Sequence, residues 1–273
     1  MAMPLRQSLR VSTYLLQQKL KRREKFPLIV ELEPLYACNL ACEGCGKIQH
    51  PAGVLKQRMP VAQAVGAVLE SGAPMVSIAG GEPLMHPQID EIVRQLVGRR
   101  KYVFLCTNAL LMRKKLDRFT PSPYFTFTVH IDGLRERHDA SVAKEGTFDE
   151  AVEAIKEAKR RGFRVTTNST FFNTDTPQTI IEVLDYLNDE LKVDEMMISP
   201  AYAYEKAPTR STSSASRRPA SCSARPSPAA TAGAGGSTTA RSSWTSSKAR
   251  STSSAPPGAS PTTRCSAGSG PAT

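Results

Sequence analysis

Three cysteines within eight residues carry the clearest chemical signal in this sequence. Cys38, Cys42 and Cys45 have the spacing C-x3-C-x2-C and directly follow an apolar run. Thiolates are soft ligands that suit iron–sulfur clusters or zinc. A structural zinc site usually has four ligands, and His50 is the nearby candidate for a fourth. Three thiolates on a cluster of four irons would leave one iron open for a substrate. The alternatives are a zinc site and three unrelated buried cysteines.

Polar turns follow further apolar runs along the chain. Two glycines after the second run would let backbone approach a ligand closely, and Glu82 follows them directly. For any single Asn or Asp, capping of a loop is an equal alternative. The candidate ligand-binding residues are Gly80, Gly81, Glu82, Pro83, Asn108, Asp132 and Asn168.

Cys106 ends the third apolar run and allows two interpretations. Free cysteine is among the most often buried residues, so a small core side chain is one of them. The place of Cys106 at the end of a strand, facing the expected site, suggests a second role: if the enzyme adds a radical to a double bond, the resulting carbon radical needs a hydrogen atom, and a thiol can give one. The second interpretation makes Cys106 a candidate catalytic residue.

Apolar runs that alternate with helical patterns predict the element order. The expected strands are 27–35, 75–79, 102–106, 124–131, 163–171 and 193–199, and the expected helices are 61–71, 88–99, 111–119, 148–161 and 177–191. Strands and helices that alternate at this spacing imply parallel βαβ units. We therefore expect an α/β fold, a partial (β/α)6 barrel over residues 27–206, with its chemistry on the loops after the strands.

The first 26 residues form a separate basic segment. Leu5, Leu9, Leu16 and Leu20 have helical spacing among seven Arg and Lys residues. Such an amphipathic helix can lie on an anionic membrane surface, or it can pack on the barrel with a solvated face. We expect a cytoplasmic protein, with the inner face of the membrane as the alternative, because no apolar run reaches the ~20 residues of a membrane span and no signal-peptide order is visible.

Residues 207–273 have a different composition. They contain no Val, Ile, Leu, Met, Phe, Tyr, Asp or Glu, but seven Arg and one Lys. Such a segment buries too little apolar surface to order itself, so we expect disorder. It accounts for +8 of the net charge of +11, and the near-balanced remainder gives no indication of a nucleic-acid partner. A natural flexible tail and a GC-rich gene read in the wrong frame both fit this composition.

The cysteine triplet and the Gly-Gly-Glu-Pro turn after the second strand resemble the radical S-adenosylmethionine (SAM) superfamily. The resemblance implies a [4Fe–4S] cluster on Cys38, Cys42 and Cys45 whose open iron chelates the amino and carboxylate groups of SAM. It also implies hydrogen bonds from the ammonium group of SAM to Glu82 or to the backbone beside it, and SAM contacts from Asp132 and the fifth strand. One position departs from the pattern. The residue before the third cysteine is usually aromatic and is Gly44 here, so a contact to the adenine side of SAM is missing or comes from elsewhere.

A denser resemblance covers nearly all of residues 1–208. It is to the adenosylhopane synthases of hopanoid biosynthesis, and the matching segments are 33–35, 38–42, 45–48, 77–84, 105–110, 121–125, 199–200 and 202–205. This resemblance implies that the 5′-deoxyadenosyl radical adds to the alkene of the triterpene diploptene, with electrons from a donor such as a ferredoxin or flavodoxin. A radical SAM enzyme with another substrate, and a SAM-binding remnant without turnover, stay as alternatives.

The same family offers an explanation for the tail. Its members continue after the equivalent of position 208 with a sequence like Asp-Gln-Glu-His-Phe, and GC-rich codons for this read one base later give Thr-Arg-Ser-Thr-Ser, the residues at 209–213. We therefore expect a frame shift near residue 209. Cys222 and Cys265 would then have no ligand role.

Overall fold

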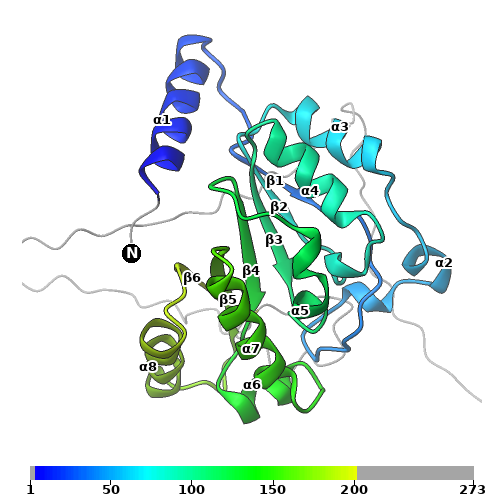
Figure 1. Ribbon diagram of the computed structural model, residues 1–273, viewed down its shortest axis with the longest axis vertical. Helices are drawn as coiled ribbons and strands as arrows, with labels where there is room; N and C mark the ends of the chain where they lie inside the picture. The colour runs from blue at the N-terminus through cyan, green and yellow to red at the C-terminus, as the bar shows by residue number, and fades with distance from the viewer. Residues whose placement is uncertain (1–3, 202–273) are drawn as a thin grey trace, which may run out of the picture. The chain divides into compact units, whose positions relative to one another are not determined.

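Six parallel strands lie side by side in sequence order, β1-β2-β3-β4-β5-β6, in a computed structural model that describes residues 4–201 (Figure 1). The expected α/β partial barrel is confirmed. The strands are β1 Ile29–Leu32, β2 Met75–Ile78, β3 Tyr102–Thr107, β4 Phe125–His130, β5 Arg164–Phe171 and β6 Glu195–Pro200. Residues 202–206, the tail at 207–273 and its two cysteines lie outside the described residues.

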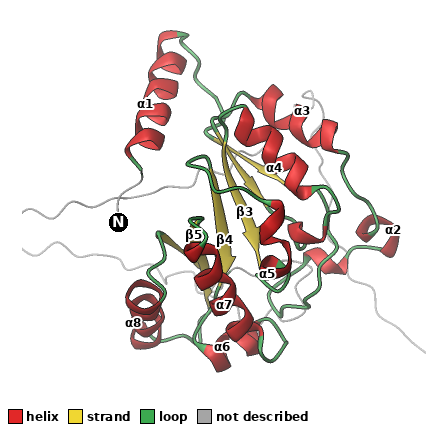
Figure 2. Cartoon of the chain, viewed as in Figure 1, coloured by secondary structure: helices red, strands yellow, loops and turns green. Residues whose placement is uncertain are grey.

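Helices follow the strands and cover one face of the sheet, where α3, α4 and α7 contact β1, β3 and β5 (Figure 2). The helices are α1 Leu5–Leu20, α2 Ala52–Leu55, α3 Val61–Ser71, α4 Ile89–Gly98, α5 Met112–Lys115, α6 Arg135–Ser141, α7 Thr147–Arg160 and α8 Pro177–Asp185. Short 3-10 turns are η1 Lys47–Gln49, η2 Pro83–Met85 and η3 Leu116–Arg118, and a π-helical turn, η4 Tyr186–Glu190, continues α8.

Two short helices escape the sequence pattern, and one expected strand is shorter than its apolar run. Helix α2 has only four residues, and the seven residues of α6 are mostly polar. Neither helix therefore repeats an apolar spacing often enough to be recognised. The run at 27–35 forms a strand only at Ile29–Leu32. Pro34 cannot donate to a ladder, and the chain leaves the sheet there for the cysteine loop.

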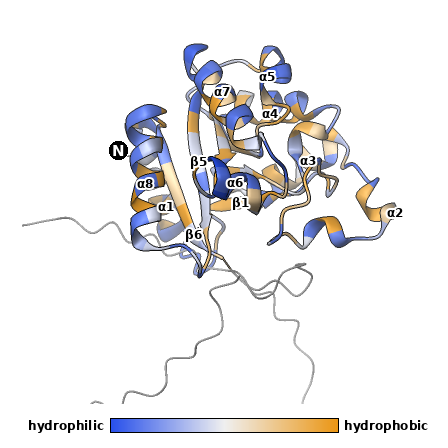
Figure 3. Cartoon of the chain, turned by 90° about the horizontal axis from the view of Figure 1, so that it is seen from below, coloured by the Kyte–Doolittle hydropathy of each residue, from blue (hydrophilic) through white to orange (hydrophobic). Residues whose placement is uncertain are grey.

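The strands separate an apolar face from a polar one. Phe125 and Phe127 are buried under the helices with ring centroids 4.7 Å apart, and the helices themselves alternate hydrophobic and hydrophilic residues (Figure 3). Side chains alternate along a strand, so the residues in between face the other way. Cys106 lies beside Thr128, and Thr128 beside Thr166, in the registered strands. We call this polar face, which carries Ser77, Cys106, Thr128 and Thr166, the inner face of the sheet.

Helix α1 contacts the amino edge of the sheet. The Gln7 amide donates to the Met75 sulfur at 3.6 Å, the Arg6 guanidinium lies 5.8 Å from the centre of the Tyr124 ring, and the Tyr14 hydroxyl donates to the Pro27 carbonyl at 2.8 Å. No helix within residues 4–201 is long and apolar enough to cross a membrane.

Candidate metal centre and ligand site

The three cysteines of the motif share one half-buried site after β1. Cys38, Cys42 and Cys45 are free thiols, and the Cys45 amide donates to the Cys42 carbonyl at 3.1 Å in a tight turn. Burial raises the pKa of Cys42 to about 12, and the neighbouring Cys45 and Cys38 add to that rise. The turn therefore brings Cys45 back towards Cys42 within the loop.

The donors of this loop are three thiols, and thiolates are soft ligands that suit an iron–sulfur cluster. His50, the sequence candidate for a fourth ligand, packs instead on the Tyr36 ring with centroids 4.9 Å apart. The chemistry of the remaining three donors therefore fits the expected [4Fe–4S] cluster.

The Gly-Gly turn after β2 packs directly on the cysteine loop. The Gly81 amide donates to the Leu35 carbonyl at 3.0 Å, and the Glu82 amide donates to the Ala37 carbonyl at 2.9 Å. A Cβ atom on Gly81 would lie 2.1 Å from the Ala37 oxygen, and one on Gly80 would lie 2.3 Å from the Leu35 oxygen. The glycines thus permit the approach of two protein backbones, a requirement that the sequence interpretation had assigned to ligand binding alone.

The Glu82 carboxylate is turned inward and joins the loop after β2 to the end of β3. One carboxylate oxygen accepts the Leu84 amide at 2.9 Å and the Thr107 hydroxyl at 2.8 Å, and the other accepts the Asn108 amide at 2.8 Å. Burial raises the pKa of Glu82, and these hydrogen bonds partly offset that rise. Pro83 is also buried. Since the carboxylate is engaged within the protein, only the backbone beside it matches the expected contact to a ligand ammonium.

Asn108 connects the β3 end to the cysteine loop. Its side-chain amide donates to the side-chain oxygen of Asn39 (Oδ1) at 2.8 Å and lies 3.8 Å from the Cys38 sulfur. An amide N–H beside a thiolate stabilises the negative charge that a cluster ligand carries. The structure therefore places Asn108 where it orients the first cysteine.

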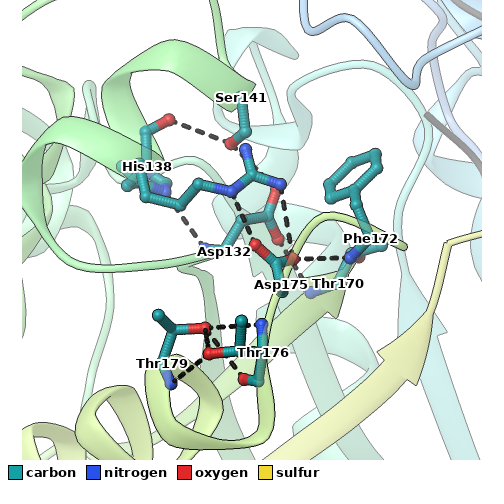
Figure 4. Close-up of polar contacts among 9 residues, drawn as sticks. Asp132, His138, Ser141, Thr170, Phe172, Asp175, Thr176 and Thr179 are labelled. Carbon is teal, nitrogen blue, oxygen red and sulfur yellow. Dashed lines mark hydrogen bonds and ion pairs between the residues drawn. The ribbon is translucent and has the colours of Figure 1, made fainter.

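Asp132 lies at the centre of a buried network after β4 (Figure 4). One of its oxygens accepts the Thr170 amide at 2.8 Å. The other accepts the Ser141 hydroxyl at 3.0 Å and lies 2.8 Å from His130 Nε2. Although burial opposes ionisation of both groups, the pairing lowers the pKa of Asp132 and raises that of His130. Because its oxygens already have protein partners, Asp132 is placed to hold His130 and the β5 end.

His138 and Asn168 complete this part of the edge. The Asp132 amide donates to His138 Nδ1 at 3.1 Å, and burial, followed by the charge of His130, lowers the pKa of His138 to about 4. Asn168 pairs with His130 across β4 and β5, and its carbonyl accepts the Ile131 amide at 3.1 Å. The Asn168 side chain is half-buried on the inner face.

An aromatic ring from another element lies beside Gly44. A Cβ atom on Gly44 would be 3.5 Å from the Phe172 ring. The Arg137 guanidinium lies 4.8 Å from the centre of that ring, and Asp175 binds both the Arg137 guanidinium and the Phe172 amide, at 2.8 and 2.6 Å (Figure 4). The place next to the third cysteine thus has an aromatic neighbour from the connection between β5 and α8.

Cys106 faces the inner side of the sheet. Its sulfur lies 3.5 Å from the Ser77 hydroxyl on β2. Burial raises the pKa of the Cys106 thiol, and the hydrogen bond with Ser77 only partly offsets that rise. At neutral pH the side chain is therefore protonated and carries the hydrogen that a donor needs.

Several residues of the site were not among the sequence candidates. They are Ser77, His130, Arg137, His138, Ser141, Phe172 and Asp175. Only His130 had a signal, as a polar residue at a strand end two positions before Asp132. Ser77 lies within β2, and the others come from α6 and from the loop after β5, where no sequence spacing indicates which side chain turns inward.

The chain is similar to proteins of known family. The family model described as "Radical SAM superfamily" matches residues 32–187. GTP 3′,8-cyclase 1 of Mycobacterium tuberculosis is 26% identical over 198 residues, which cover 66% of this chain and 55% of that protein. Pre-heme d1 synthase of Dinoroseobacter shibae is 25% identical over 166 residues, which cover 59% of this chain and 40% of that protein. The chain thus spans about half the length of these relatives.

Solved structures share the fold. The crystal structure of Streptococcus suis SuiB bound to S-adenosylmethionine superposes with a TM-score of 0.60 at 19% identity, over 72% of this chain and 46% of that one. The structure of SuiB with its precursor peptide SuiA gives a TM-score of 0.59 at 20% identity, over 76% and 47% of the two chains.

Replacement of any one of the three motif cysteines should prevent stable cluster assembly, because each would supply one iron with its protein ligand. After anaerobic reconstitution, Cys38→Ala, Cys42→Ala and Cys45→Ala should each lose the iron–sulfur absorbance and most of the bound iron. Cys106→Ala is the matched control and should keep both. A motif variant with full iron and sulfide content would remove that cysteine from the ligand set.

Gly81→Ala should destabilise the protein, since its methyl group would overlap the Ala37 carbonyl. Overpacking of this kind costs roughly 3 kcal/mol. Gly66→Ala is the control, because Gly66 lies exposed in α3 with no atom near its missing Cβ, and it should gain up to about 1 kcal/mol. Urea unfolding of both variants measures the difference, and equal stabilities would show that the loop contact is not tight.

Stability should fall between pH 6.5 and pH 4 because of His138. Its pKa is about 4 when folded, whereas the unfolded chain takes up the proton near pH 6.5, so acid favours unfolding by up to about 3 kcal/mol. His138→Asn keeps an acceptor for the Asp132 amide but cannot titrate. Its free energy of unfolding should change less over this range than that of the unchanged protein. Parallel curves would show that His138 titrates normally.

Proposed function

Because the chain belongs to the radical SAM superfamily, we propose that it is an enzyme that cleaves SAM reductively and adds the 5′-deoxyadenosyl radical to the alkene of diploptene, giving adenosylhopane. The observation that carries the proposal is the protonated Cys106 thiol on the inner face, next to Ser77. Addition to an alkene leaves a carbon radical that must receive a hydrogen atom. A half-buried thiol on the inner face is suited to give it.

The residues that would hold the cofactors are those at the carboxyl edge. Cys38, Cys42 and Cys45 would bind a [4Fe–4S] cluster, and when bound this cluster and SAM supply the 5′-deoxyadenosyl radical. Asn108 holds Cys38 from one side through its contacts with the cysteine loop. Glu82 fixes the loop after β2 against the loop after β3, so the backbone at 80–83 has one position relative to the thiols.

Cys106 would complete the reaction. The substrate carbon radical takes the hydrogen atom from the thiol, so that a C–H bond forms, the S–H bond breaks and a thiyl radical remains. One electron and one proton then restore the thiol. The electron would come from the one-electron donor that the enzyme already needs, a protein such as a ferredoxin or flavodoxin.

A second substrate class has support from the inner face and from the relatives. Thr128 and Thr166 share a hydrogen bond at 3.0 Å there, and Asn168 lies two residues after Thr166 on the same face of β5. A hydrocarbon gains nothing from such groups, whereas a polar substrate would, and relatives named GTP 3′,8-cyclase match the chain. A radical SAM enzyme acting on a polar molecule is therefore the second candidate. A chain that binds SAM without turnover is the third candidate.

An anaerobic assay in deuterated water separates these candidates. The reconstituted protein receives SAM, a reductant and either diploptene or GTP, and the products are analysed by mass spectrometry. We expect an adenosyl–triterpene adduct carrying one deuterium, because the Cys106 thiol exchanges with solvent. Cys106→Ala should release 5′-deoxyadenosine at an unchanged rate without the reduced adduct, and Ser77→Ala should keep the adduct.

The other outcomes are equally specific. An adduct without deuterium, or formed equally by Cys106→Ala, would reject the thiol as donor. A GTP-derived product would favour the second candidate. Release of 5′-deoxyadenosine without any adduct would reject diploptene for this chain, and the same assay on a chain with the reading frame restored at 209 would show whether the tail causes that failure.

A further inference from the structure

Helix α1 turns a row of four leucines to solvent. Leu5, Leu9, Leu16 and Leu20 are 75%, 60%, 58% and 74% exposed. Their spacings of four, seven and four residues place them on one side of a helix with 3.6 residues per turn. We call this row the leucine stripe. Other exposed large apolar side chains, such as Leu69 and Ile181, occur singly on their helices.

The opposite side of α1 is the one that packs on the protein. Gln7 and Gln18 are 7% and 5% exposed, and Gln7 and Tyr14 hydrogen-bond to Met75 and the Pro27 carbonyl. The helix is thus attached through polar side chains, contrary to the usual arrangement of an amphipathic helix. Rotation that buried the leucines would expose these contacts, so the packing itself keeps the stripe outside.

Positive charge flanks the stripe on both sides. On a helical projection Arg6 and Arg10 follow one edge of the stripe and Lys19 follows the other, and residues 5–23 contain no Asp or Glu. Within residues 4–201 none of these three cations has an ion-pair partner, whereas Lys156, Arg160 and other cations elsewhere do. Arg10 also lies close enough to Lys101 to add to the effect of burial, which lowers the Lys101 pKa.

We infer that α1 binds the surface of a membrane containing anionic phospholipid, with the leucine stripe in the acyl boundary and the flanking cations on the phosphates. A helix with an apolar face and basic flanks suits this position, about 5–10 Å into the interface. The positive charge beside the stripe favours an anionic membrane over a second copy of the chain. A second copy of the chain would bring the same cations against these, which opposes association. The inference concerns location and does not depend on the substrate.

The position of α1 separates this surface from the chemistry. Its contacts are with Met75 at the start of β2, Tyr124 before β4 and Pro27 before β1, so it lies at the amino edge of the sheet. The cysteine loop lies at the carboxyl edge. Variants of the stripe should therefore leave cluster content and SAM cleavage unchanged, which provides an internal control.

The test is co-sedimentation of the full reconstituted chain with vesicles of phosphatidylcholine alone or with added phosphatidylglycerol. Leu9→Gln combined with Leu16→Gln should weaken binding to the anionic vesicles at least about tenfold. Arg10→Gln combined with Lys19→Gln should weaken it about 25-fold at low salt, roughly fivefold for each charge. Leu69→Gln combined with Ile181→Gln removes exposed apolar side chains elsewhere and should leave binding within about twofold.

Two results would overturn the inference. Binding that the leucine variant leaves unchanged would mean that other basic groups, such as the eight Arg and Lys residues at 207–273, hold the protein on the vesicles. A dimer in lipid-free buffer, measured by light scattering and lost in the leucine variant, would assign the stripe to a second copy of the chain.

Discussion

Close backbone contact between the loop after β1 and the loop after β2 underlies the whole site. Gly80 and Gly81 bring that second loop against residues 35–37 at distances where no side chain fits, and the Glu82 carboxylate then extends the contact to Thr107 and Asn108 after β3. Three loops become one rigid unit in this way. The cysteine loop is therefore positioned by hydrogen bonds and close backbone packing from the loops after β2 and β3.

The parallel sheet gives each strand two different environments. Alternate residues enter either an apolar layer under α3, α4 and α7 or the polar inner face. The same alternation that buries Leu105 places Cys106 opposite it, beside Ser77 and Thr128. A one-residue shift of β3 would exchange them. The position of Cys106 on the inner face thus depends on the core packing of its neighbours on β3.

A second unit forms around Asp132 on the other side of the edge. It accepts hydrogen bonds from β5 and α6 and holds the His130 ring, while its own amide fixes His138. The pKa of His130 is raised because it pairs with the Asp132 carboxylate, whereas burial lowers the pKa of His138. The Arg137 guanidinium stacks on the Phe172 ring, which lies beside Gly44 in the cysteine loop. Charged side chains from β4, α6 and the loop after β5 are thus placed next to that loop.

The sequence alone determined the fold class, the element order and the position of the three thiols in one loop. Strand periodicity and the C-x3-C-x2-C spacing are local patterns, so they can be recognised from residues close together in the chain. It also showed the leucine spacing of α1. Tertiary structure alone decided which side of α1 is covered, that Glu82 turns inward, that the glycines serve a loop contact, and that Phe172 lies beside Gly44. These depend on contacts between residues far apart in the chain, and no local spacing encodes which partner a side chain meets.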